Sequence, residues 1–238
     1  MKLAVVTDFD GTLMHQDVGD YLMEELGVTD LPEVRQMSRL VREKKIGSME
    51  WIKVAYAKLD GQKQTVDQLL GQVHLRSGAE SFLDFCQDRD IPVTILSDGM
   101  EYYVHSIVNQ LQLNIQDIIV NPIRYREDGS YELGLQNANE ACRWCGCCKS
   151  EAVRKIKSDD YRIIYIGDGS SDYFGSSFAD WIFARGSLAH YLEQDGTPFY
   201  PFETFHDIMA VLAPEIESFE QGIADRKSDK AHPFCRFS

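Results

Sequence analysis

Two aspartates one residue apart follow the first apolar segment of the chain. Residues 3–7 form a short run rich in β-branched side chains, which predicts a buried strand, and Asp8 and Asp10 come directly after it. Alternate residues of an extended chain point the same way, so both carboxylates can converge on one spot. Two carboxylates this close repel each other unless a cation lies between them, and oxygen ligands of this kind suit Mg²⁺. The stretch predicts a magnesium-assisted centre, with a pair of helix-capping aspartates as the alternative.

Two later predicted strands also end in polar residues. Residues 91–96 lead into Ser97, and residues 161–166 lead into a glycine-rich turn that carries Asp168 and Asp172. Ligands of an open α/β sheet bind at the carboxyl ends of its strands, so we expect these side chains to lie beside the first pair. The sequence therefore predicts one site assembled from three strand ends.

Each of these residues has an ordinary structural alternative when it is taken alone. Ser97 could cap the helix that follows it, and Asp168 and Asp172 could be loop carboxylates. Lys149 begins a basic helix and could simply be exposed, as most lysines are, or it could supply the positive charge that a phosphate site needs. The functional interpretation depends on their joint occurrence.

The elements that must position these residues fall into two groups. Residues 14–78 show helical periodicity in four short segments with no strand, as expected for a cap inserted after the first strand, whereas residues 1–13 and 79–238 show the α/β alternation of a catalytic core. Within the core, residues 123–135 predict a tight hairpin around an Asp-Gly turn. The basic residues of the insert are expected mostly on a solvated face: Arg35, Arg39, Arg42, Lys44, Lys45, Lys53 and Arg76.

Composition restricts the class of partner. The chain has 238 residues, of which 44% are apolar, and 24 basic against 38 acidic residues give a net charge of −14. Such a charge disfavours nucleic acid and anionic membranes as general partners and leaves a small metabolite as the expected ligand. The first apolar run meets a carboxylate too soon for a signal peptide, and we expect a cytoplasmic protein without a membrane span.

Four of the six cysteines crowd into seven positions. The set has enough thiols for a structural zinc site, although its compact spacing lacks the two separated knuckles of the familiar zinc fingers. An internal disulfide and a reduced, partly buried loop are the alternatives. The four residues are Cys142, Cys145, Cys147 and Cys148.

The order of the polar clusters resembles the four motifs of the haloacid dehalogenase (HAD) superfamily of aspartate-nucleophile phosphatases. The matching residues are Asp8-Phe9-Asp10-Gly11-Thr12, Ser97, Lys149 and Gly167-Asp168-Gly169-Ser170-Ser171-Asp172. The resemblance implies a Rossmann-like, doubly wound, mostly parallel sheet with the helical cap on it.

The same resemblance implies the roles of the residues. Asp8 would attack phosphorus and form an aspartyl-phosphate, and Asp10 would protonate the leaving oxygen and later deprotonate water. Mg²⁺ would be held by Asp8, Asp168 and the Asp10 carbonyl, with Asp172 a ligand or a residue that orients one. The phosphate would be bound by Ser97, Asp98, Gly99 and Lys149.

The helical insert is similar to that of the phosphoserine phosphatase branch, and four short motifs resemble the methionine-salvage phosphatases that act on 2-hydroxy-3-keto-5-methylthiopentenyl 1-phosphate. These motifs are Ser97–Met100, Cys145–Lys149, Phe183–Gly186 and Pro201–Phe205. Asp17 stands where phosphoserine phosphatases carry a glutamate for the substrate amine, so Asp17 and the neighbouring His15 are candidates for substrate specificity.

Alternatives from two classes remain open at this point. Phosphoserine, phosphoethanolamine and phosphocholine are alternative substrates within the branch, and phosphocholine should need an aromatic cage. A catalytically silent HAD-fold binding protein is the alternative from another class. Such a protein would have no use for the second acid-base carboxylate, Asp10.

Overall fold

A computed structural model describes residues 2–137, 139–158 and 160–228 of the chain. Its centre is a six-stranded parallel sheet in the order β3-β2-β1-β6-β7-β8, which confirms the predicted α/β class. The strands are β1 (Lys2–Thr7), β2 (Val93–Met100), β3 (Asp117–Asn121), β6 (Tyr161–Gly167), β7 (Trp181–Ala184) and β8 (Tyr200–Pro201). Because β1 lies between β2 and β6, the three predicted strand ends are neighbours.

Helices cover both faces of this sheet, so its strands read as continuous apolar runs. In β1, Leu3 and Val5 pack into one core and Ala4 and Val6 into the other. The helices of the core are α5 (Ala79–Gln87), α6 (Glu101–Gln110), α7 (Lys149–Ser158), α8 (Asp172–Ser176), α9 (Gly186–Asp195), α10 (Phe205–Leu212) and α11 (Ile216–Gln221). Helices α8, α9 and α11 were not predicted from the sequence.

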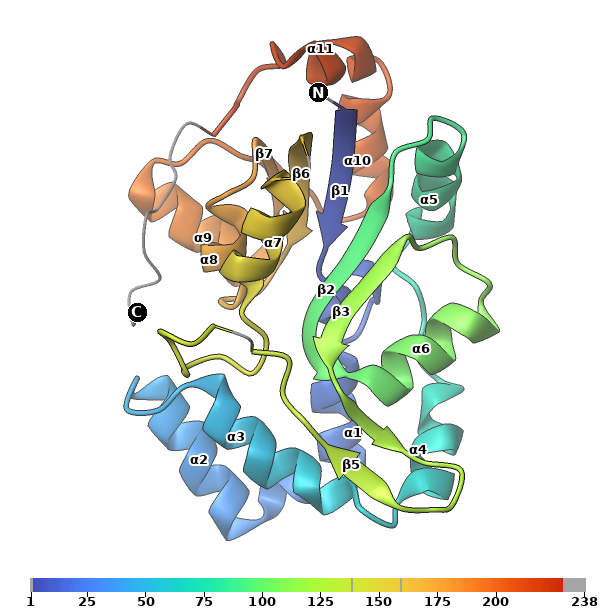
Figure 1. The fold of residues 1–238 in the computed structure, drawn as a ribbon, viewed down its shortest axis with the longest axis vertical. Coiled ribbons are helices and arrows are strands. Elements are labelled where there is room, and N and C mark those ends of the chain that lie inside the picture. The colour runs from blue at the N-terminus through green and yellow to red at the C-terminus, as the bar shows by residue number, and fades with distance from the viewer. Residues whose placement is uncertain (1, 138, 159, 229–238) are drawn as a thin grey trace.

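The insert consists of helices gathered at the carboxyl ends of β1 and β2, at the lower end of the view in Figure 1. They are α1 (Val18–Glu25), α2 (Pro32–Arg42), α3 (Ser48–Ala55) and α4 (Lys63–Leu70), with short 3₁₀ turns η2 (Val28–Asp30) and η3 (Tyr56–Leu59). The prediction of four short helices is thus confirmed. The insert leaves and rejoins the core through two adjacent segments, paired by an antiparallel bridge between Met14 and Leu75.

The predicted hairpin is present as β4 (Ile123–Tyr125) and β5 (Tyr131–Leu133). It lies against the insert, since the Tyr125 hydroxyl donates to the Leu59 carbonyl at 2.5 Å and the Tyr131 hydroxyl donates to the Tyr56 carbonyl at 2.7 Å. The insert and the β4–β5 hairpin, which are far apart in the sequence, therefore pack together near the carboxyl ends of the strands. Among the described residues, none of the helices combines the length and the apolar character needed to cross a membrane.

Candidate active site

Asp8 and Asp10 flank the point where the chain leaves β1. The Asp8 N–H donates to the Ile166 carbonyl at 2.9 Å, which continues the pairing with β6 and brings the two strand ends together. The turn η1 (Phe9–Leu13) follows, with Gly11 at φ +69°. A Cβ atom on Gly11 would lie 2.8 Å from an Asp168 carboxylate oxygen, so this glycine is required both for the backbone conformation and for the approach of that carboxylate.

Three carboxylates converge at this edge of the sheet. Asp8, Asp168 and Asp172 each offer an oxygen within 4.8 Å of the others. Burial, followed by repulsion from Asp172, raises the pKa of Asp8, and burial is also the main cause of the raised pKa of Asp168. The Thr12 hydroxyl orients Asp168 by donating to it at 2.7 Å. An all-oxygen set with excess negative charge fits a hard divalent cation such as Mg²⁺.

Lys149 provides a buried positive charge between two of these carboxylates. Its Nζ atom donates to Asp8 Oδ1 at 2.8 Å and to Asp172 Oδ1 at 2.7 Å. Burial alone would lower the pKa of Lys149, but the two carboxylates raise it well above the usual value, so the ammonium form persists. Asp172 also accepts from the Tyr165 hydroxyl at 2.6 Å and from both N–H groups of residues 168–169. These contacts make it the residue that orients the lysine and the turn.

The Asp10 carboxylate points away from the cluster into a ring of donors. Oδ1 accepts from the N–H groups of Val18 and Gly19, at 3.1 and 3.4 Å, in the first turn of α1. Oδ2 accepts from the Ser97 and Tyr103 hydroxyls, both at 2.8 Å. Burial raises the pKa of Asp10, while these hydroxyl donors oppose the increase. Tyr103 was not identified from the sequence, where nothing distinguishes it from an ordinary core residue of a helix.

The residues that follow β2's predicted end do not all face the cluster. Ser97 and Gly99 lie within β2, which extends past the predicted end to Met100 with a shift of register after Leu96, and the Ser97 hydroxyl accepts from the Gly99 N–H at 2.9 Å in this irregular part of the strand. Asp98 instead accepts from the Cys147 N–H at 2.6 Å and from the Ser48 hydroxyl at 3.1 Å. Its side chain therefore joins the loop before Lys149 to the start of α3.

A cavity of about 240 Å³ lies between this edge of the sheet and the insert. The core supplies the catalytic-edge carboxylates together with Ser97 and Lys149. The insert supplies two further carboxylates, Asp17 and Asp20, and an aromatic and apolar wall of Trp51, Ile52 and Tyr56. Trp51 and Tyr56 meet edge to face with ring centroids 6.0 Å apart. Among the described residues that line the cavity, Lys149 is the only cation.

The two predicted specificity residues have different surroundings. Asp17 lines the cavity together with Asp20 and begins α1, where it accepts from the Asp20 N–H at 2.8 Å. Asp17 keeps solvent access at the mouth of the cavity, but desolvation by the surrounding protein, followed by repulsion from Asp10 and Asp20, raises its pKa to about 8. His15 is exposed and is not among the described residues that line the cavity.

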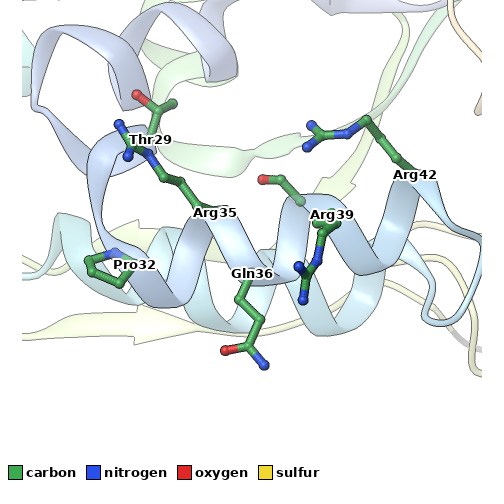
Figure 2. Close-up of a pocket in the computed structure, with 7 residues that line it drawn as sticks. Thr29, Pro32, Arg35, Gln36, Arg39 and Arg42 are labelled. Atoms are coloured by element: carbon green, nitrogen blue, oxygen red, sulfur yellow. The ribbon is translucent and has the colours of Figure 1, made fainter.

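A second, larger hollow of about 690 Å³ lies on α2 (Figure 2). Its described lining includes Thr29 and three arginines from successive turns of the helix: Arg35, Arg39 and Arg42. All three arginines are exposed, as the sequence predicted, and none of the described residues lining the hollow belongs to the carboxylate cluster. The chemistry therefore belongs to the smaller cavity.

Arg76 was expected on the solvated face of the insert, and that prediction is wrong. Only 5% of the residue is exposed, and its guanidinium group donates to the carbonyls of Gly11 and Thr12. A further N–H donates to the Glu203 carbonyl at 3.3 Å. The partners are backbone carbonyls brought close by the fold, so no complementary charge in the sequence marks them. Arg76 anchors the end of the insert to the turn η1 that follows β1.

The cysteine cluster does not form the zinc site that was considered. Among the described residues, the carboxylate cluster is the only group of three or more potential ligands that converges. The loop is held by amides instead: Asn137 donates to the Cys145 carbonyl at 2.6 Å, and Asn139 donates to the Cys148 sulfur at 3.6 Å, while Cys147 packs into the core. Cys86, Cys142, Cys147 and Cys148 are free thiols, and Cys235 lies outside the described residues.

Comparisons with known proteins agree with this geometry. A family model described as haloacid dehalogenase-like hydrolase matches residues 5–173. A protein of Exiguobacterium sibiricum is 30% identical over 88% of this chain and 95% of its own, and one of Bacillus mycoides is 26% identical over 91% and 99%. Both are named 2-hydroxy-3-keto-5-methylthiopentenyl-1-phosphate phosphatase.

Solved structures of phosphoserine phosphatase share the fold. A phospho-aspartyl intermediate analogue has a TM-score of 0.66 at 20% identity and covers 88% of this chain and 98% of its own. A substrate-bound complex has a TM-score of 0.65 at 19% identity with the same coverage. The site and its relatives make the protein a phosphoric monoester hydrolase, and the match over most of the chain shows that it belongs to the haloacid dehalogenase-like hydrolase family.

Proposed function

We propose that the protein is a Mg²⁺-dependent phosphomonoesterase that hydrolyses 2-hydroxy-3-keto-5-methylthiopentenyl 1-phosphate through an aspartyl-phosphate. The observation that carries the proposal is the contact of Lys149 with Asp8 inside a cavity that the core also lines with the carboxylates of Asp10, Asp98 and Asp168. The substrate is taken from the names of the relatives. We place the reaction in the cytoplasm, where the free thiols would remain reduced.

Asp8 is placed to act as the nucleophile. It lies at the end of β1 with Oδ1 held by the Lys149 ammonium, which leaves its second oxygen to attack phosphorus. A carboxylate is a poor nucleophile toward a phosphate dianion, so the positive charge of Lys149 is needed to offset the repulsion. Asp8, Asp168 and the Asp10 carbonyl would hold Mg²⁺, with Asp172 beside them. When bound, the metal ion would neutralise negative charge on the phosphate oxygens.

Asp10 would move the protons. In the first step its carboxyl gives a proton to the ester oxygen as the bond from phosphorus to the leaving group breaks, and in the second step its carboxylate takes a proton from the water that attacks the aspartyl-phosphate. The two steps return both Asp8 and Asp10 to their starting forms. Ser97 and Tyr103 hold Asp10 at 2.8 Å each, next to the phosphate position that Ser97 and Gly99 would define.

We propose that residues 14–78 act as a cap that selects the substrate. The wall of Trp51, Ile52 and Tyr56 suits an apolar group such as a methylthioalkyl chain, and closing such a wall over the phosphate would exclude water from the charged site. Phosphoserine fits less well. Its carboxylate would need a cation, and Lys149, the only one among the described lining residues, is committed to Asp8 and Asp172.

A second candidate is phosphoethanolamine or phosphocholine, favoured by one specific observation. Asp17 and Asp20 add two carboxylates to the same end of the cavity as the Trp51 and Tyr56 rings, and an ammonium group is attracted both to carboxylates and to aromatic faces. The two candidates differ in charge at that end of the substrate. Neutralising Asp17 should therefore distinguish them.

The test is a panel of phosphate esters assayed for phosphate release with Mg²⁺ and with excess chelator. We expect the methylthiopentenyl ester to be the best substrate and Trp51→Ala to raise its KM more than that of p-nitrophenyl phosphate, with Trp181→Phe in the distant core as the control. Preference for phosphoserine would refute the substrate assignment. Loss of phosphoethanolamine turnover in Asp17→Asn would support the second candidate, and absence of hydrolysis for every ester would refute the phosphomonoesterase itself.

A further inference from the structure

The Tyr103 hydroxyl contacts Asp10 from outside the four motifs. Tyr103 lies in the first turn of α6, is fully buried, and donates to Asp10 Oδ2 at 2.8 Å. Gly99 makes room for it, because a Cβ atom there would lie 2.1 Å from the tyrosine oxygen and 2.7 Å from Asp10 Oδ2. The ring stacks on Phe9, the residue between the two catalytic aspartates, with centroids 6.1 Å apart. Packing of the ring and the contact with Asp10 therefore fix the position of the Tyr103 hydroxyl.

A second tyrosine extends this contact into the insert. The Tyr103 hydroxyl oxygen would lie 3.5 Å from a Cβ atom on Gly19, and Tyr56, in η3, is buried at the same place. Its hydroxyl lies over Gly19, where a Cβ atom would be only 2.6 Å from it. Gly19 is also one of the N–H donors to Asp10. Because Gly99 and Gly19 lack a Cβ atom, the Tyr103 and Tyr56 hydroxyls can approach Asp10 and the first turn of α1. Tyr56 belongs to the insert, so these neighbouring residues connect the insert with Asp10.

We propose that Tyr103 is a positioning residue for Asp10 and that Tyr56 links that function to the insert. The inference rests on the proposed acid-base role of Asp10. A carboxyl group that gives and then takes a proton needs a partner that suits both forms. A hydroxyl group can donate to the carboxylate and accept from the carboxyl, so the Tyr103 hydroxyl suits both forms of Asp10. Backbone N–H groups, the partners of the other Asp10 oxygen, can only donate.

This role predicts a loss that depends on the leaving group. An alkyl phosphate needs a proton on its leaving oxygen, whereas p-nitrophenolate leaves without one, so misplacing Asp10 should slow formation of the aspartyl-phosphate only for the alkyl ester. Hydrolysis of the aspartyl-phosphate needs Asp10 as a base with either ester. The aspartyl-phosphate should therefore accumulate with the nitrophenyl ester in a variant that lacks the Tyr103 hydroxyl.

The experiment compares Tyr103→Phe with wild type on glycerol 2-phosphate and p-nitrophenyl phosphate, both with Mg²⁺. For glycerol 2-phosphate we expect kcat to fall by roughly ten- to a hundred-fold with KM nearly unchanged, since general acid-base catalysis as a whole contributes about 10²–10⁴. For p-nitrophenyl phosphate we expect a burst of nitrophenolate close to the enzyme concentration. Tyr102→Phe is the matched control, because the adjacent hydroxyl contacts Asp67 on the surface and should leave both reactions unchanged.

Several results would overturn the inference. An equal fall in kcat for both esters without a burst, or wild-type rates for both, means that Tyr103 does not position Asp10. If Tyr103→Phe melts well below wild type, Tyr56→Phe is assayed in its place. A smaller fall in kcat for glycerol 2-phosphate together with a nitrophenolate burst supports the inference. Rates equal to those of Tyr102→Phe refute it. Wild-type protein that hydrolyses neither ester refutes the proposed function instead, so the two failures are distinguishable.

Discussion

Replacing Arg76 with methionine should destabilise the protein, because the change removes a buried cation whose partners are backbone carbonyls. Methionine retains much of the volume of the arginine stem, so the lost free energy comes mainly from hydrogen bonds. The guanidinium group donates to Thr12 at 2.9 Å and to Gly11, and more weakly to Glu203 and His15, each at 3.3 Å, and to Met14 at 3.5 Å. Gly11 keeps a second donor, since Arg185 Nη1 contacts the same carbonyl at 3.0 Å. The carbonyl that depends most on Arg76 is that of Thr12.

The magnitude follows from this count. Leaving one buried carbonyl without its charged donor costs about 1.5–3 kcal/mol, and loss of the remaining, longer or shared bonds adds roughly 1 kcal/mol. We therefore expect the free energy of unfolding to fall by about 3 kcal/mol. For a chain of this size, each kcal/mol lowers Tm by about 2–4 °C, so Tm should drop by roughly 6–12 °C.

The assay is thermal unfolding monitored by circular dichroism, supported by urea denaturation. Arg35→Met is the matched control, because Arg35 belongs to the same insert but its side chain is 66% exposed and pairs with Asp30 at the surface. Such a pair contributes about 0–1 kcal/mol, so the control should melt within about 4 °C of wild type. If Arg76→Met melts as the control does, the insert is not anchored through this side chain.

Five further outcomes are expected. Excess chelator should abolish phosphate release, and Asp8→Asn should abolish both turnover and acid-stable phosphate on the protein while leaving Tm nearly unchanged; labelling in that variant would identify another nucleophile. Gly11→Ala should weaken Mg²⁺ activation, because its Cβ would lie 2.8 Å from Asp168 and φ is +69°; an unchanged Mg²⁺ titration would contradict this. Asp172→Asn should lower kcat by roughly ten- to a hundred-fold, since an amide cannot accept from both the Lys149 side and the backbone N–H groups; wild-type kcat would show that Asp172 orients nothing. The pKa of Asp17 is raised from 3.8 to about 8, so the folded state holds a proton that the unfolded chain releases, and stability falls as pH rises through this range. Asp17→Asn, which retains an N-cap oxygen, should therefore raise Tm relative to wild type more at pH 9 than at pH 5 in metal-free buffer; equal Tm differences at both pH values would contradict this assignment.

The sequence alone predicted the α/β class and the convergence of Asp8, Lys149 and Asp168. It could do so because these features depend on local pattern and on a general rule. Apolar runs define the strands, helical periodicity defines the insert, and parallel strands that are neighbours place their ends at one edge. The hairpin around Asp128-Gly129 was predictable for the same local reason.

Only the tertiary structure decided the roles of Tyr103, Arg76 and the cysteine loop. The Tyr103 hydroxyl reaches Asp10 across 93 positions of the chain, and Arg76 reaches Gly11 across 65. The partners of Arg76 are main-chain carbonyls, which every residue carries, so no residue type in the sequence marks the contact. The thiol spacing allowed a zinc site, but Cys147 is directed into the core while Asn137 and Asn139 hold the loop. Contacts of this kind depend on how distant segments pack against each other, and the local spacing of apolar residues does not predict that packing.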